Sequence, residues 1–148
     1  MLEHFKIESY EDALSNIIDV LKPIKEYYPK YEDWIEGVVQ AGILNDTRKI
    51  RVLKNDGRIA GLSILKDTDS EKKICSLFIH PEYRGESWMY SIFTDSLAYL
   101  KTNKPVITIP STIIKKYHGL IFSNQWENTS RIENRYQPGI IEYGFNEK

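Results

Sequence analysis

Cysteine and histidine are scarce in this sequence. The chain has one cysteine, Cys75, so no disulfide can form within it, and its three histidines are spread widely along it. A zinc site needs several such ligands held in a defined geometry. We therefore expect no metal site, and we expect Cys75, which stands in an apolar stretch, to be a buried structural residue and not a nucleophile.

An excess of charge of either sign is also absent. Lysine and arginine number 20, aspartate and glutamate number 21, and the formal net charge is -1. A nearly neutral chain has no long-range field that would attract the phosphate backbone of a nucleic acid. We expect no nucleic-acid partner.

Long hydrophobic runs are missing too. Residues 1–10 include Glu3, His4, Lys6 and Glu8, so they lack the continuous apolar run of a signal peptide. No stretch of the sequence is long and apolar enough to cross a bilayer. We expect a cytoplasmic protein without a membrane partner, and the lone cysteine agrees with that reducing compartment.

What is present is the composition of an ordinary globular domain. Hydrophobic residues make up 41% of the 148 residues and charged residues 28%. A chain of this length buries about two thirds of the surface that it exposes when unfolded. No repeat, linker or low-complexity segment divides it, so residues 1–148 are expected to form a single domain.

The first part of the chain carries two helical patterns. Ser9 stands three residues before Asp12, as at the start of a helix, and apolar residues follow at helical spacing over 14–21. A second helical pattern covers 31–39. Residues 42–47 are expected to form its exit loop.

A β-hairpin is predicted next. Asn55-Asp56-Gly57 supplies residues that tolerate the left-handed backbone of a tight turn. The turn joins an alternating strand around Ile50 and Val52 to an apolar strand over 58–66. Because both faces of the second strand are apolar, we expect it to lie in the centre of a sheet.

The second half begins with a strand and the clearest helix of the chain. A strand over 74–80 stops at Pro81, and apolar residues from Met89 to Leu100 then recur at helical spacing until Pro105 prevents continuation. The elements expected after it are a strand over 106–109, a helix from Pro110 to Tyr117, an extended segment over 126–136, a turn at Gln137-Pro138-Gly139 and a strand over 140–145. This order predicts an α/β (α+β) fold, with a mixed, mostly antiparallel central sheet and helices on both of its faces.

The segment between that strand and the long helix is the candidate binding site. A strand that ends at a proline and is followed by a short loop and a helix aims several backbone N–H groups at one point, where an anion can bind. The loop and helix start consist of Arg84, Gly85, Glu86, Ser87, Trp88 and Met89. Arg84 adds a fixed positive charge to this anion site.

At this loop the sequence resembles the GNAT superfamily of acetyl-CoA-dependent N-acetyltransferases, in particular its small bacterial single-domain branch. Members of that superfamily follow a strand with an Arg/Gln-x-x-Gly-x-Gly/Ala loop that holds the pyrophosphate of coenzyme A, and Arg84 matches the first residue of the loop. The similarity extends to residues 71–75, 104–108 and 136–139, and it covers the chain from about Trp34 to the end.

The resemblance implies a fold, a reaction and a set of site residues. It implies the GNAT acyl-CoA N-acyltransferase fold, acetyl-CoA as cosubstrate, and transfer of the acetyl group to an amine of a small molecule or a protein. It also implies that strand 74–80 splays from strand 106–109 to admit pantetheine, and that a homodimer can form through the sheet edges. The cofactor-binding residues implied are Phe78, Ile79 and His80 through their backbone, and Arg84, Gly85, Glu86, Ser87, Trp88 and Met89 at the loop and helix start.

Some positions depart from the family pattern. The glycines of the family loop fall on Ser87 and Met89, and Glu86 adds a negative charge. The tyrosine that serves as general acid in many members corresponds to Ile121, so Tyr117, one turn earlier, is the catalytic candidate in its place, and no base is assigned. These departures keep a second interpretation open, in which the chain is a catalytically degenerate GNAT-fold module that binds a partner protein.

Overall fold

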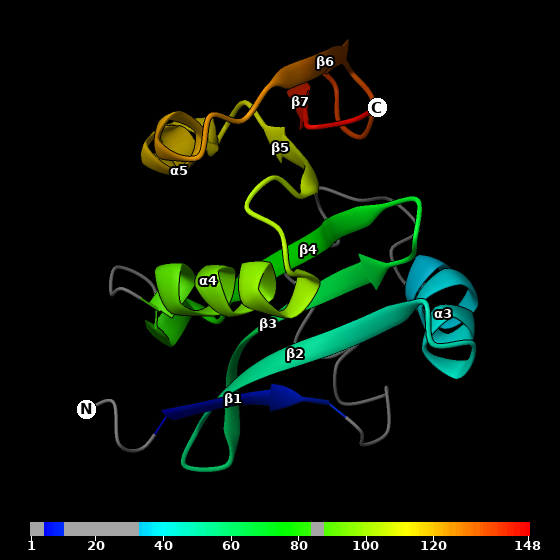
Figure 1. Ribbon diagram of the computed structural model, residues 1–148. Helices are drawn as coiled ribbons and strands as arrows, with labels where there is room; N and C mark the ends of the chain where they lie inside the picture. Colours follow the sequence, from blue (N-terminus) through cyan, green and yellow to red (C-terminus); the bar gives the residue numbers. More distant parts are fainter. Residues whose placement is uncertain (1–4, 11–32, 84–87) are drawn as a thin grey trace.

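The computed structural model of the protein describes residues 5–10, 33–83 and 88–148 (Figure 1). Within these ranges, seven strands form one sheet in the order β1-β2-β3-β4-β5-β7-β6. The strands are β1 (Phe5–Ser9), β2 (Arg48–Asn55), β3 (Arg58–Asp67), β4 (Lys72–Ile79), β5 (Val106–Pro110), β6 (Asn128–Glu133) and β7 (Ile141–Phe145). Neighbouring strands are antiparallel except β4 and β5, which are parallel. This confirms the mixed, mostly antiparallel sheet.

Helices of three kinds surround the sheet. They are the π-helix η3 (Trp34–Val39), the α-helices α3 (Gln40–Leu44), α4 (Trp88–Leu100) and α5 (His118–Ser123), and the 3₁₀-helices η4 (Pro81–Tyr83) and η5 (Ile114–Tyr117). Within the described residues, no helix is long and apolar enough to cross a membrane. The helix predicted over 14–21 lies outside the described residues.

The β2–β3 hairpin confirms the turn predicted from the sequence. Asp56 and Gly57 join the strands with φ angles of 49° and 81°, and both lie in the left-handed region that such a turn requires. β3 is the third strand of the sheet and is buried along most of its length. Its apolar character on both faces is therefore explained by its central position.

Two boundaries differ from the sequence prediction, and each lies next to a contact with a neighbouring strand. The helix expected to end before Gly42 continues to Leu44, and Gly42 packs against the side chain of Arg48 in β2. Pro110, expected to begin a helix, ends β5 instead: the chain stays in the sheet as far as Ser111, whose N–H donates to the carbonyl of Ile141. The helical segment then runs from η5 through α5.

Helices cover both faces of the sheet, as predicted. Ile35 and Val39 of η3 pack with Val52 of β2 on one face, and Ile92 of α4 packs with Leu53 of β2 on the other. Neighbouring residues of a strand point to opposite faces, so the sheet separates these two clusters. A further cluster joins α4 and α5 to β5 and β7 on the α4 side.

Candidate functional site

The central strands β4 and β5 diverge soon after they meet. Their pairing is confined to Lys73 with Val106 and Ile74 with Ile107. Beyond these pairs β4 continues to Ile79 along β3, and β5 continues along β7. Figure 1 shows β5 leading away from β4. The splay implied by the resemblance is present, and we call it the β4–β5 divergence.

The hydrogen bonds of β4 determine which of its backbone groups point toward this divergence. The His80 N–H donates to the carbonyl oxygen of Ala60 in β3 over 2.7 Å. Because backbone groups of alternate residues in a strand point to the same side, those of Phe78 also point toward β3, and those of Leu77 and Ile79 point toward β5. Of the three residues expected to face pantetheine, the register therefore turns Phe78 and His80 away. The backbone groups of Ile79 face the β4–β5 divergence as expected, and those of Leu77, which was not among the expected residues, face it as well.

The first turn of α4 is packed against the sheet by its side chains. The Trp88 indole stacks on Phe5 of β1, with ring centroids 3.7 Å apart, and Trp88 is 7% exposed. Met89 packs against the same cluster. The side chain that replaces a family glycine at Met89 thus contributes to the core. Arg84, Gly85, Glu86 and Ser87 lie outside the described residues.

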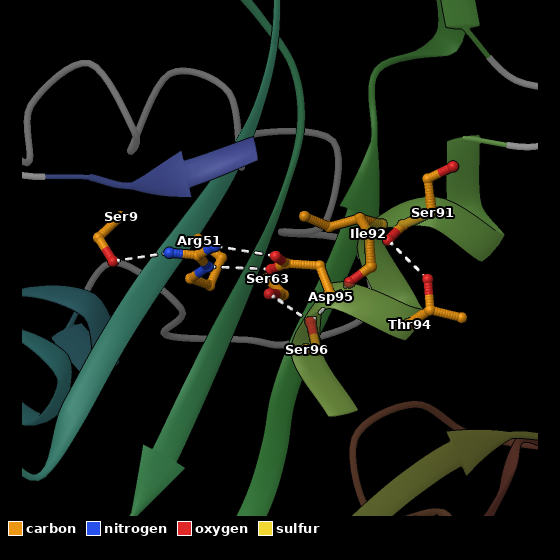
Figure 2. A network of polar contacts seen from close by, with 8 residues as sticks. All are labelled: Ser9, Arg51, Ser63, Ser91, Ile92, Thr94, Asp95 and Ser96. Atoms are coloured by element: carbon orange, nitrogen blue, oxygen red, sulfur yellow. Dashed lines mark hydrogen bonds and ion pairs between the residues drawn. The ribbon is translucent and has the colours of Figure 1, made fainter. Parts of the chain in front are cut away.

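An ion pair holds the middle of α4 to the sheet (Figure 2). The Arg51 guanidinium of β2 donates from Nε and Nη2 to the two carboxylate oxygens of Asp95, over 2.9 and 2.8 Å. Its Nη1 donates to the Ser9 hydroxyl of β1 over 3.0 Å, and its plane lies over the Tyr99 ring. Hydrogen bonding to Asp95 raises the pKa of Arg51. This pair ties β1, β2 and α4 together.

A buried pair of hydroxyl groups adds a second connection. The Ser96 hydroxyl of α4 and the Ser63 hydroxyl of β3 lie 2.8 Å apart, and the Ser96 hydroxyl also lies 2.8 Å from the carbonyl oxygen of Ile92. Both serines are fully buried. Together with the ion pair, this contact fixes α4 over β2 and β3, and it thereby fixes where the helix start lies relative to the end of β4.

Tyr117 is the last residue of η5, and its ring is buried among aromatic side chains. It is 5% exposed, and its ring centroid lies 6.0 Å from that of Phe93 in α4. Burial raises the pKa of Tyr117 to about 12. At neutral pH the phenol is therefore protonated, as a general acid must be, but it is a weaker acid than an ordinary tyrosine.

Glu142 of β7 is a candidate that the sequence reasoning missed. It is 4% exposed, and its buried Oε1 atom has no hydrogen-bond partner among the described residues. Burial raises the pKa of this carboxyl group, and the charge of Arg135 opposes that shift. The signal in the sequence was a single acidic residue inside the apolar strand that begins at Ile140.

Two other expectations concern cysteine and metal ions. Nη1 of Arg48 donates to the Sγ atom of Cys75 over 3.0 Å, and burial raises the pKa of the Cys75 thiol. Cys75 is half-buried and not fully buried as expected. A thiol held neutral in this way is nevertheless a poor nucleophile. In the part of the chain that the structure describes, no three histidine, cysteine, aspartate or glutamate side chains are grouped so that they could hold a metal ion.

Comparison with known proteins gives matches in structure alone. No protein-family model matches the chain, and no curated protein matches its sequence. An N-acetyltransferase from Staphylococcus aureus Mu50 superposes with a TM-score of 0.71 at 12% identity, over 95% of this chain and 96% of that one. A protein named as a GNAT-family acetyltransferase, from Desulfovibrio desulfuricans, gives 0.69 at 9% identity, over 95% and 96%. The chain has the GNAT fold.

Other GNAT-fold structures agree with this assignment. A dodecameric spermidine N-acetyltransferase from Vibrio cholerae superposes with a TM-score of 0.69 at 12% identity, over 97% of this chain and 92% of that one. Such coverage includes the central sheet, α4 and the C-terminal hairpin of this chain. The expected fold is confirmed, and at this level of identity the activity has to be argued from the site.

Proposed function

We propose that this GNAT-fold chain is a single-domain N-acetyltransferase that transfers the acetyl group of acetyl-CoA to an amine. The observation that carries the proposal is the β4–β5 divergence beside the start of α4. The backbone groups of Leu77 and Ile79 are directed toward β5, and Trp88 at the start of α4 packs in one cluster with Ile79 at the end of β4. Strand-end backbone groups can bind an amide-containing chain, and a helix start can bind its phosphates.

The described residues fit such a ligand. Trp88 and Met89 direct their side chains to the core, which supports space for a diphosphate at the helix start. Arg84 supplies the positive charge, and Gly85, Glu86 and Ser87 complete the proposed loop. Acetyl-CoA would bring the thioester, and backbone N–H groups of β4 would polarise its carbonyl as negative charge develops on the oxygen.

Tyr117 is retained as the proposed general acid for the departing thiolate. Its pKa of about 12 makes the proton available at neutral pH but unfavourable to transfer. We therefore expect Tyr117→Phe to lower kcat by less than about tenfold. A loss beyond about a hundredfold would instead give Tyr117 a full catalytic role.

Isothermal titration calorimetry with acetyl-CoA tests the proposal. Binding with micromolar affinity is expected, and Arg84→Glu should weaken it because a like charge then faces the diphosphate. Lys104→Glu, the same charge reversal on an exposed residue beyond the far end of α4, is the control and should leave the affinity unchanged. No heat and no thermal shift with acetyl-CoA would refute the proposed function.

The second candidate function is a GNAT-fold module that binds a partner without catalysis. The observation in its favour is the burial of Tyr117, which leaves the proposed acid with a raised pKa. A thiol assay for released coenzyme A over a panel of primary amines separates the two functions. Turnover excludes the binding module, whereas acetyl-CoA binding without release of coenzyme A from any amine favours it.

A further inference from the structure

Glu142 carries a buried carboxyl group that the reaction described so far does not use. It is 4% exposed, and its Oε1 atom has no hydrogen-bond partner within residues 5–10, 33–83 and 88–148. It is the one residue with such an atom in the described part of the chain. An unpartnered buried carboxylate destabilises the folded state, and perturbed groups of this kind concentrate at functional sites.

The Glu142 side chain points to the sheet face opposite α4. Tyr143 and Phe145 belong to the cluster under α4 and α5, and successive residues of a strand alternate between faces. Glu142 and Gly144 thus share the other face. A Cβ atom added to Gly144 would collide with the carboxylate of Glu147, so Glu147 lies on that face as well.

Glu142 also stands beside the open end of the β4–β5 divergence. It is the cross-strand partner of Pro110, the last residue of β5. β5 contacts β4 only near its own first residues, Val106 and Ile107, so Pro110 marks the end where the two strands have separated. Adjacent strands lie about 4.8 Å apart. Glu142 is therefore one strand from the opening, on the face away from the proposed diphosphate site.

Among the residues that the structure describes, Glu142 has no fixed counter-ion. Its neighbours across the sheet, Pro110 and Ile132, carry no charge, and the charge of Arg135 lowers its pKa against the stronger effect of burial. Glu147, on the same face, differs: the Ser130 and Thr129 hydroxyls donate to it and its pKa is lowered. Of the two carboxylates Glu142 and Glu147, Glu142 is thus the one that can accept a cation or a proton.

We propose that Glu142 is the acceptor-site carboxylate of this protein, which pairs with the ammonium group of a cationic primary amine and takes one of its protons. The proposal rests on the proposed acetyl transfer. Glu142 accepts one proton from the ammonium, and the neutral amine nitrogen attacks the thioester carbonyl carbon. The C–N bond forms, the C–S bond breaks, and the departing sulfur takes a proton from the Tyr117 phenol and leaves as a thiol. The second proton of the nitrogen restores the phenol. Glu142 then returns its proton to solvent.

A comparison of Glu142→Gln with Glu147→Gln tests the catalytic part. Glu142→Gln should bind acetyl-CoA as the wild type does but lose about a hundredfold or more in kcat/KM for primary amines. It should also lose the acid limb of the pH profile, and Glu142→Asp should restore part of both. Glu147→Gln removes a carboxylate with partners on the same face and should leave rate and profile unchanged. Wild-type rate and profile in Glu142→Gln would overturn the proposal.

A measurement without acetyl-CoA separates this proposal from the proposed function. Butylammonium chloride should raise the Tm of the wild type and of Glu147→Gln but not that of Glu142→Gln, while butan-1-ol, the neutral analogue, should stabilise none of them. A Glu142-dependent shift supports the site even if acetyl-CoA does not bind, in which case only the proposed function fails. Equal shifts in all three proteins, or no shift in any, overturn the site. In the absence of ligand, Glu142→Gln should raise the Tm, whereas a residue needed only for packing would lower it.

Discussion

The ion pair between Arg51 and Asp95 gives the sharpest quantitative test of how α4 is held. We consider the double-mutant cycle of Arg51→Met, Asp95→Asn and the combined variant, because both substitutions keep the size of the side chain. Two charge-assisted hydrogen bonds join the pair, and its side chains are 17% and 19% exposed. Such a hydrogen bond contributes about 1.5–3 kcal/mol, and partial exposure screens it. We expect a coupling free energy of about 2 kcal/mol.

Urea unfolding of the four proteins, followed by circular dichroism, measures this coupling. In thermal unfolding, Asp95→Asn alone should lower the Tm by about 4–8 °C for a domain of this size. The matched control is the pair Arg131 and Glu133, which makes a contact of similar length, 2.7 Å, but is 52% and 57% exposed. Its cycle should show no measurable coupling, because solvent screens the charges. Equal coupling in the two cycles would refute the reasoning that partial burial makes the first pair strong.

Three further predictions follow from single positions. Because the pKa of Tyr117 is raised from 10.0 to about 12 in the folded state, the stability that it contributes is lost as the pH rises from about 10 to 12, by up to about 1.4 kcal/mol per pH unit. Tyr117→Phe should therefore reduce the loss of stability to urea between about pH 10 and 12, and parallel curves for the two proteins would contradict this. Trp88→Ala should cost about 3–5 kcal/mol in urea unfolding because the ring is buried, whereas Tyr90→Ala on the 61% exposed position should have little effect. Ser96→Ala should lower the free energy of unfolding by about 1–3 kcal/mol, because the buried Ser63 hydroxyl loses its partner. If that is the cause, the double variant Ser63→Ala/Ser96→Ala should be more stable than Ser96→Ala, and equal or lower stability would argue against it.

The local elements of the fold were predictable because their signals are local. The Asp56-Gly57 turn needs two left-handed residues, and the sequence places tolerant residues there. The stripe of α4 and the doubly apolar character of β3 depend only on periodicity within each element. The order of these elements also predicted a mixed sheet covered on both faces.

The candidate site was predictable only in outline. The end of β4 and the start of α4 follow from Pro81 and the helical stripe, but the residues that face the β4–β5 divergence depend on the register between β3 and β4, which turns Phe78 and His80 away from it. Register is a property of two paired strands and cannot be read from one of them.

What the sequence alone determined was therefore the kind of each element and the fold class, since backbone preferences and apolar spacing act over a few residues. Only the tertiary structure decided that Pro110 ends a strand, that Arg51 meets Asp95 and that Glu142 is buried beside the opening between β4 and β5. Each of these depends on contacts between segments about 30 residues or more apart in the chain. Such contacts form because strand pairing and burial lower the free energy of the whole domain, and no local pattern in the sequence encodes them.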